Sequence, residues 1–537
     1  MNISYVIKKY FKPFSIRLII LFVFSSISAV LSSIFPYITG TVVNEIASQN
    51  RLYVIFRLCI ILATIFFVEQ IIEYLSLRLQ TVVQLNAGAN FYNDMLFCVQ
   101  DSPLLISEKL NKTETNQIIN QDTTTVIRYI LSTFCTSVKR ILSTIILVCI
   151  CVSINLRSSL LLVLFVLGTI AIYLLLQRKL YDVKLAVKNS NSHYFAKMFE
   201  QFAYIPFIKA YSIEKLFRKR ICVPFIKLKT AIEQNCNYTF LYTFLFSILS
   251  VSIQILMFIT GSLSLKSGTF GIGYFVTFSN YFAMLQSSIK YFASLGTGYQ
   301  SVHIALKRLD KYADMPTDLR GCQDVGNIKG IKLIHLHFEF DNRIVIRDLT
   351  YSFVPGKIYG ISGKNGCGKS TLINILMGLY NSNLERGMVF YNDIEIHSID
   401  TAVLRKDQIT YLGQLPILMD ADYQSNVWSI ADKHDTQKQR LHTQLQRILN
   451  LNFSERKGLN VSTTMSGGEA QKVCLIRSLL KDTGFLLLDE PTNALDAGSV
   501  ANLMQYLQSI RKNRIIILVS HEAAVLEKCD EVIHMSA

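Results

Sequence analysis

Long apolar runs separated by polar stretches fill about the first three hundred residues, and a different pattern follows. A bilayer core about 30 Å thick is crossed by about 20 apolar helical residues. The runs therefore predict six membrane-spanning helices. The spans are expected near 18–38, 53–75, 135–155, 158–177, 238–264 and 271–293. Together they predict an all-α transmembrane domain over residues 1–310.

The connections between the predicted spans alternate in length. Those near Gln49, Asn155 and Ser267 are short, whereas 78–135 and 178–236 are long, charged and helical in periodicity. The basic N-terminal segment places the N-terminus in the cytoplasm by the positive-inside rule. The long connections then fall on the cytoplasmic side as extensions of the helices. An even number of spans also returns the C-terminal part of the chain to the cytoplasm.

Four ionisable residues lie within or beside the predicted spans. Glu69 and Glu73 share one helix face because they are four residues apart, and Lys139 and Arg140 precede the third span. These groups either pair between helices or form a charged wall facing a substrate cavity. Further candidates for lining a cavity are Gln254, Asn280, Gln286 and Lys290.

Composition narrows the class of protein. The chain is 51% hydrophobic and 17% charged, with a net charge of +16. Basic residues gather between Arg178 and Lys229, which the positive-inside bias of a membrane protein explains, and no nucleic-acid-reading motif accompanies them. Nucleic acid is therefore not expected as a partner. The eleven cysteines have no zinc-type spacing and are expected to be free thiols.

After a linker over 311–327, residues 328–537 alternate strand and helix patterns of an α/β domain. The stretch "KIYGISGKNGCGKSTLINILMGLY" reads as a strand, a glycine loop and an apolar helix, and it fits G-x-x-x-x-G-K-[ST]. Such a loop wraps phosphate with backbone N–H groups, while its lysine reaches the β- and γ-phosphates and its hydroxyl binds Mg²⁺. The predicted ATP-binding residues of the loop are Gly363, Lys364, Asn365, Gly366, Cys367, Gly368, Lys369, Ser370 and Thr371.

Two later strands end in candidate catalytic residues. "GFLLLDEP" delivers Asp489 and Glu490 at the carboxyl end of a buried strand, where ligands bind in parallel α/β sheets. Asp489 suits a water-mediated Mg²⁺ contact, and Glu490 suits polarisation of the attacking water. His521 follows "ILVS" at another strand end and is expected to contact the γ-phosphate.

With these residues placed, the whole chain resembles an ABC transporter half-subunit of the six-helix exporter type. "YLGQLPILMDADYQSNV" is similar to the family's Q-loop, which makes Gln414 a ligand of Mg²⁺ and a catalytic residue. "NALD" resembles the D-loop, which makes Asp496 the D-loop aspartate. "SGGE" resembles the signature motif, whose residues contact the partner's ATP. Its members are Ser466, Gly467, Gly468 and Glu469.

Further segments carry the resemblance or depart from it. Residues 199–217 resemble the second coupling helix of such exporters, and 115–130 the first, with Asp122 at the family's aspartate position. Phe340 stands where the family's adenine-stacking aromatic is expected, the alternative being a core phenylalanine. Met465 and Glu469 depart from the usual signature, and no acidic-glycine loop is recognisable in "GLNVSTTMSGG".

The resemblance implies a transmembrane domain followed by a P-loop ABC ATPase domain, with ATP and Mg²⁺ as cofactors. It implies ATP hydrolysis at the interface with a second half-transporter, identical or related, which drives transport across a membrane, expected to be a bacterial plasma membrane. Export of a small peptide, lipid or amphipathic compound is the first expectation. The alternatives are an importer of exporter-like architecture, of siderophore type, and a weakly hydrolysing ATP-gated regulatory or channel subunit.

Overall fold

The computed structural model describes residues 1–48, 52–266, 271–340, 343–364, 366–451, 465–493 and 495–535. The chain forms two compact units. Unit 1 comprises residues 1–97 and 112–314, and unit 2 comprises 98–111 and 315–537. Residues 98–111, which lie inside the predicted transmembrane domain, thus pack with unit 2. The predicted boundaries at 310 and 328 stay a prediction.

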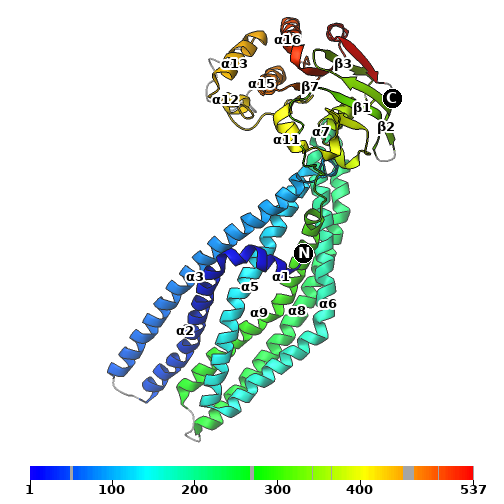
Figure 1. Ribbon diagram of the computed structural model, residues 1–537. Helices are drawn as coiled ribbons and strands as arrows, with labels where there is room; N and C mark the ends of the chain where they lie inside the picture. The colour runs from blue at the N-terminus through cyan, green and yellow to red at the C-terminus, as the bar shows by residue number, and fades with distance from the viewer. Residues whose placement is uncertain are drawn as a thin grey trace. The chain divides into compact units, whose positions relative to one another are not determined.

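Where the structure describes it, unit 1 is built of helices and their connections, without strands (Figure 1). Its helices are α1 (Ile3–Val6), α2 (Ser15–Ala47), α3 (Leu52–Gln100), α5 (Lys112–Ile154), α6 (Leu156–Ala203), α7 (Ile205–Tyr211), α8 (Glu214–Lys266) and α9 (Ile272–Ala313). A π-helical turn, η1 (Ile7–Phe11), and a 3₁₀ turn, η2 (Lys12–Phe14), join α1 to α2. The long connections are indeed helical, since α3, α5, α6 and α8 continue well beyond the predicted spans.

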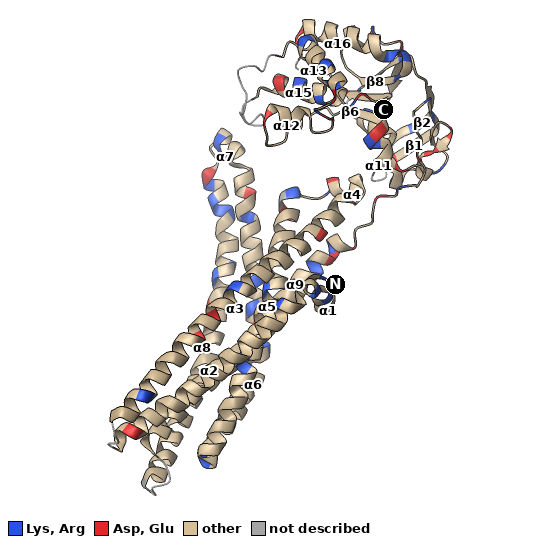
Figure 2. Ribbon diagram, turned by 60° about the vertical axis from the view of Figure 1, so that its left-hand side comes forward, with Lys and Arg blue, Asp and Glu red and all other residues tan. Residues whose placement is uncertain are grey.

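Five described helical segments are long and apolar enough to cross a membrane: Ile3–Ala47, Leu52–Gln100, Glu114–Ile154, Leu156–Ala203 and Glu214–Leu265. Figure 2 shows the long charge-free stretches, such as the part of α6 between Arg157 and Arg178. Helix α9 is not among the five, because polar residues such as Asn280 and Gln286 lower its mean hydropathy. The sixth span stays a prediction.

Close packing of α2 on α9 illustrates how unit 1 is held together. A side chain at Gly40 would overlap Thr277, and one at Gly273 would overlap the Gly40 carbonyl, so the two backbones touch. The Asn44 side chain accepts the Gly273 N–H at 2.6 Å, and the Tyr281 hydroxyl donates to the Ser33 carbonyl at 2.7 Å. Small residues at the contact and polar bonds across it are the usual means of joining helices in membranes.

The charged residues near the third span are paired. Lys139 of α5 forms ion pairs with Glu73 and, at 3.5 Å, with Glu69 of α3, while Arg140 donates to Ser287 of α9 at 2.7 Å. Glu73, Lys139 and Arg140 also line a cavity of about 540 Å³. Pairing between helices is therefore confirmed for Glu69, Glu73 and Lys139, and the charged wall of a substrate cavity stays a prediction.

The segment 115–130 is not a separate coupling helix, which corrects the prediction. It is the first part of the long α5, and the short helix between α3 and α5 is α4 (Leu104–Glu108), in unit 2. Asp122 is nearly buried and bonds Arg308 of α9 at 2.5 Å. Within 199–217, α7 does form a short separate helix, as the resemblance implies.

Unit 2 holds two sheets. The antiparallel sheet has the order β2-β1-β4-β5 and the parallel sheet the order β6-β7-β8-β3-β9. The strands are β1 (Ile331–Phe340), β2 (Arg343–Phe353), β3 (Ile358–Gly363), β4 (Val389–Tyr391), β5 (Ile394–Glu395), β6 (Ile409–Leu412), β7 (Phe485–Asp489), β8 (Ile515–Val519) and β9 (Glu531–Met535). Every residue of β7 and β8 is buried, as their continuous apolar sequences require.

The helices of unit 2 pack around these sheets (Figure 1). Besides α4 they are α10 (Lys369–Leu376), α11 (Thr401–Val403), α12 (Tyr423–Val427), α13 (Thr436–Ile448), α15 (Gly467–Leu479), α16 (Ala497–Ile510) and α17 (Ala523–Leu526). Short 3₁₀ turns lie at Asn381–Asn383, Ile396–Ser398 and Arg511–Asn513, and a π-helical turn at Leu404–Gln408. Leu105 of α4 is buried in the same apolar core as β1, β3 and α10.

Candidate nucleotide site

A cleft of about 490 Å³ lies in unit 2 where four neighbouring parallel strands end. The loops after β6, β7, β8 and β3 meet here because the strands are parallel and adjacent. The cleft is lined by Phe340, Arg343, Val345, Gly366, Gly368, Lys369, Ser370, Thr371, Gln414, Asp489, Glu490 and His521. Ten of these twelve residues are sequence-predicted site residues; Arg343 and Val345 of β2 were not predicted.

The glycine loop takes a backbone form that side chains would hinder. Gly366 and Gly368 have φ angles of 82° and 98°, in the left-handed region. A side chain at Gly368 would approach Val345 to 3.0 Å. Lys369 begins α10, and its Nζ donates to the Gly363 and Lys364 carbonyls at 2.7 and 3.1 Å. The lysine is thus held along the loop that would wrap phosphate.

Not every predicted loop residue faces the cleft. Cys367 is 1% exposed and packs within the domain, so its thiol has no access to a ligand. Gly363 and Lys364 contribute through their carbonyls. Asn365 lies outside the described residues.

Asp489 has the burial and neighbours expected of an Mg²⁺-binding carboxylate. It is 6% exposed, and burial followed by the neighbouring Glu490 raises its pKa to about 6, while the hydroxyl of Ser370 bonds it. Mg²⁺ in phosphate-transferring sites takes one or two carboxylates together with hydroxyl and phosphate oxygens. Ser370, Asp489 and Gln414 all line the cleft and fit this donor set.

Glu490 is positioned by three side chains. Gln414 and Asn493 donate to its Oε2 at 3.2 and 2.5 Å, and His521 Nε2 lies 3.4 Å from its Oε1. Its φ of 47° is unusual for a glutamate, and such strain costs on the order of 1–3 kcal/mol. The backbone N–H of Glu490 donates to the Val519 carbonyl of β8 at 3.0 Å, which keeps it in place. This arrangement aims one carboxylate into the cleft between Gln414 and His521.

Phe340 lies at the edge of the cleft and is 36% exposed, which rules out the alternative of a core phenylalanine. Its ring offers an open face for stacking. The Lys109 Nζ, just after α4, lies 5.3 Å from the ring centroid. The negative face of the ring attracts this cation, which adds positive charge near the cleft.

The predicted signature residues form the start of α15 and do not line the cleft. Ser466 and Glu469 form a capping box, in which Glu469 Oε2 accepts from the Ser466 N–H and hydroxyl, both at 2.9 Å. These bonds give Glu469, which departs from the usual signature, a structural role as a helix cap. Gly467 and Gly468 are the first two residues of the helix, and a side chain at Gly467 would meet no neighbour.

Asp496 likewise begins a helix. It accepts from the Ser499 N–H at 2.9 Å and from the Ser499 hydroxyl at 2.7 Å, and Lys472 lies 3.3 Å away. These bonds, the hydroxyl first, lower the pKa of Asp496 to about 2. It does not line the cleft either. Residues 452–464, which hold most of the segment before the signature, and Ala494 of "NALD" lie outside the described residues.

The fold and the cleft define a P-loop ATPase-type domain fused to a bundle of membrane-type helices. The ABC transporter transmembrane region model matches residues 18–289, and the ABC transporter model matches 346–493. The chain belongs to the ABC transporter family, and it has the half-transporter architecture of the exporter type.

Two relatives and one solved structure illustrate the similarity. The ATP-dependent lipid A-core flippase 1 of Colwellia psychrerythraea is 26% identical over 49% of this chain and 46% of its own length. The exotoxin translocation ATP-binding protein PaxB of Pasteurella aerogenes is 28% identical over 50% of this chain and 39% of its own length. The chain thus spans half or less of the length of these curated relatives. A bacterial Atm1-family ABC exporter with ATP bound has a TM-score of 0.77 at 14% identity, over 98% of this chain and 94% of that one.

Proposed function

We propose that this chain is one half of an ATP-driven exporter that moves a small peptide, lipid or amphipathic compound out of the cytoplasm across a bacterial plasma membrane. The observation that carries the proposal is the cleft, which gathers Lys369, Asp489, Glu490 and His521 within 490 Å³ at adjacent strand ends. The names of the relatives above, a flippase and a toxin translocation protein, support export of a lipid or a peptide.

The predicted residues that line the cleft have the following tasks in ATP hydrolysis. Phe340 stacks on the adenine, and Lys369 and the loop N–H groups bind the β- and γ-phosphates. Ser370, Gln414 and, through a water, Asp489 would hold Mg²⁺, which would neutralise negative charge on the phosphates. Glu490 orients the attacking water and takes its proton, and His521 binds the γ-phosphate and holds Glu490.

The second half of each site comes from a partner, a homologous or identical half-transporter. Ser466 and Gly467 of one chain face the γ-phosphate held by Lys369 of the other, so ATP favours the closed pair. Asp496 lies beside the same interface. Hydrolysis removes the γ-phosphate contact and releases the closed state. The N-terminus and unit 2 are cytoplasmic in this arrangement.

The test uses the full-length protein in lipid vesicles. ATP hydrolysis must depend on Glu490, and substrate must accumulate inside inverted vesicles when ATP is supplied. Net movement out of inverted vesicles would favour the importer alternative. Negligible hydrolysis by the wild-type protein would favour the regulatory or channel subunit and contradict the proposal.

A further inference from the structure

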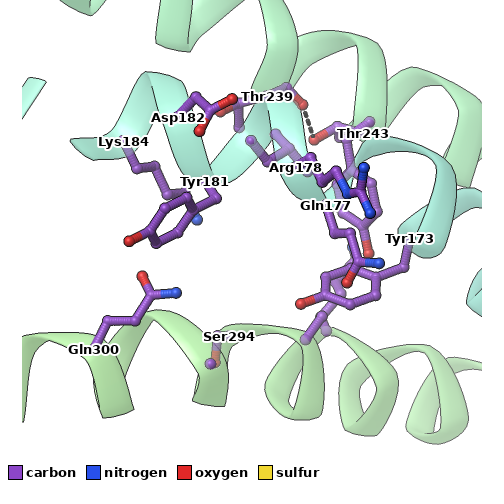
Figure 3. Close-up of a pocket in the computed structure, with 15 residues that line it drawn as sticks. Tyr173, Gln177, Arg178, Tyr181, Asp182, Lys184, Thr239, Thr243, Ser294 and Gln300 are labelled. Carbon is purple, nitrogen blue, oxygen red and sulfur yellow. Dashed lines mark hydrogen bonds between the residues drawn. The ribbon is translucent and has the colours of Figure 1, made fainter. Parts of the chain in front are cut away.

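A second large cavity lies in unit 1 between α6, α8 and α9, with a volume of about 690 Å³. Its lining combines three basic residues, Arg178, Lys184 and Lys290, with one acidic residue, Asp182. Figure 3 shows Tyr173, Gln177 and Tyr181 directed from α6 toward α9, and Gln300 directed back from α9. The cavity is therefore walled by three different helices, and basic and polar groups stand among a larger apolar surface.

Several basic residues elsewhere in unit 1 have a carboxylate partner, unlike those of this cavity. Lys139, Arg308, Lys197 and Lys229 each form an ion pair with a carboxylate. Within the described part of the chain, Arg178, Lys184 and Lys290 form no ion pair, and Asp182 forms none with them. All three basic side chains are exposed, so their charges are open to an anionic ligand.

One of these cations is held in place by an aromatic ring. Lys290 Nζ lies 5.1 Å from the ring centroid of Phe246, which is 3% exposed and belongs to the apolar core of α5, α6, α8 and α9. The lysine stem therefore follows apolar surface while its charge stays at the cavity. This places a positive charge where the polar cavity meets the apolar core.

The cavity also lies where three predicted spans end. The predicted spans 158–177, 238–264 and 271–293 end or begin within a few residues of Arg178, Thr239 and Lys290. Tyr173 and Tyr242 in its lining suit a membrane–water boundary, because their rings are apolar and their hydroxyls polar. On α9, a Cβ added at Gly296 would meet only the Tyr173 hydroxyl, at 3.8 Å, so there is room between the helices.

Exposed apolar residues continue from the cavity along α6 and α8. Leu174 and Leu175 of α6 are 57% and 80% exposed, and Phe240 and Phe244 of α8 stack with ring centroids 5.8 Å apart. A ligand seated among the cations could thus lay an acyl or alkyl chain along apolar surface. A small inorganic anion would use only the polar half of this surface.

We propose that the cavity between α6, α8 and α9 is the cytoplasmic entry site of the cargo, and that the cargo is an anionic amphiphile. Its phosphate or carboxylate group binds Arg178, Lys184 and Lys290, and its apolar chain follows α6 and α8 toward the membrane. This assignment rests on the proposed export function, since it names the substrate class of that function.

The experiment uses the full-length protein in nanodiscs of zwitterionic lipid, with radiolabelled dodecyl phosphate as the probe. Binding is measured without ATP, and stimulation of ATP hydrolysis is measured relative to the basal rate of each variant. Each of Arg178→Gln and Lys290→Gln is expected to weaken binding about fivefold, and the double variant about 25-fold, because a basic group near a membrane contributes about 1 kcal/mol. Lys179→Gln is the matched control, since it removes the same charge from the adjacent position of α6 but does not line the cavity.

Several outcomes would overturn the proposal. Equal binding by the double variant and the wild type would show that the cavity does not hold the anionic group. Equal stimulation by dodecyltrimethylammonium would remove the charge selectivity, and competition by inorganic phosphate at equal concentration would show a free-anion site. Binding without stimulation would identify a resident lipid instead of cargo. Because binding is measured without ATP, a wild type that hydrolyses no ATP would sink the export function separately from this assignment.

Discussion

The nucleotide cleft of unit 2 and the basic cavity of unit 1 are similar in size, about 490 and 690 Å³, but their charged groups are held differently. In the cleft, Lys369 bonds two loop carbonyls and Glu490 has three partners. In the cavity, Arg178 and Lys184 form no ion pair within the described residues. Chemistry needs groups fixed before the substrate arrives, whereas a site for a flexible amphiphile tolerates mobile side chains.

The strongest test of this contrast is Glu490→Gln. Removing the carboxylate should lower turnover at least about a hundredfold, because general-base assistance contributes about 10² to 10⁴. ATP binding, measured by filtration, should persist. Glu527→Gln, at the end of α17 and away from the cleft, should match the wild type. Turnover within a factor of two of the wild type in Glu490→Gln would show that the cleft is not organised around this residue.

The second test concerns pH and Asp489. Its pKa is raised to about 6, so protonation as the pH falls through 6 should weaken Mg²⁺ binding about tenfold per unit. The measurement is the Mg²⁺ concentration for half-maximal hydrolysis at pH 7 and pH 5, corrected for Mg²⁺ binding to free ATP. A ratio that is unchanged after correction would contradict the role assigned to Asp489.

The same carboxylate affects stability with a definite sign. Its folded-state pKa lies above the ordinary value, so the ionised group destabilises the fold above pH 6, and this cost disappears as the pH falls toward 4. Asp489→Asn should therefore stabilise unit 2 by about 2 kcal/mol at pH 7, with little difference at pH 4. Thermal unfolding at the two pH values measures this, and equal shifts at both would refute it.

Phe340 should have an intermediate effect. Loss of aromatic stacking costs about 1–3 kcal/mol per base, so Phe340→Leu should raise the KM for ATP about tenfold. Phe340→Tyr keeps an aromatic face and should remain within about twofold of the wild type. Equal KM values for the leucine and tyrosine variants would mean that the ring does not stack on the base.

The smallest effect is expected at Glu469, which combines a capping bond with a negative charge close to where a partner's ATP is proposed to bind. Glu469→Gln preserves the capping box and removes the charge. Turnover should rise about twofold through weaker repulsion of phosphate, as measured by steady-state hydrolysis. Glu469→Ala is the control for the lost cap, and its melting temperature should fall. A drop in turnover for the glutamine variant would indicate that the carboxylate itself takes part.

The two cavities were not equally predictable from the sequence. Phosphate and Mg²⁺ chemistry imposes fixed spacings between residues, so the sequence motifs predicted ten of the residues that line the cleft. Arg343 and Val345 were not predicted, because they reach the cleft only through the pairing of β2 with β1. Of the cavity residues, Lys290 alone was predicted to line a cavity, because no spacing rule governs contacts between three helices. Lys184 is an ordinary surface lysine by pattern.

Other differences between the predictions and the structure also arise where contacts join distant parts of the chain. The first coupling helix was assigned to 115–130 because that stretch resembles the family's segment, but the structure has it within α5, and α4 (104–108) is too short to give a periodic signal. The capping role of Glu469 needs only local geometry and follows from the S-x-x-E spacing. Local rules were thus sufficient for helix starts and phosphate loops, and insufficient for contacts between distant helices.

The burial of Leu105 in the core of unit 2 has a consequence for biosynthesis. Segment 98–111 leaves the ribosome more than four hundred residues before β9 is complete, and it packs with strands such as β1 that do not yet exist. At about 5–20 residues per second, α4 waits roughly 20–80 seconds for its core. During that time the apolar side chains of Leu104 and Leu105 remain uncovered while α5 to α9 are made. A synonymous change that slows translation after α9 should therefore lengthen the interval in which a chaperone or protease can capture this segment.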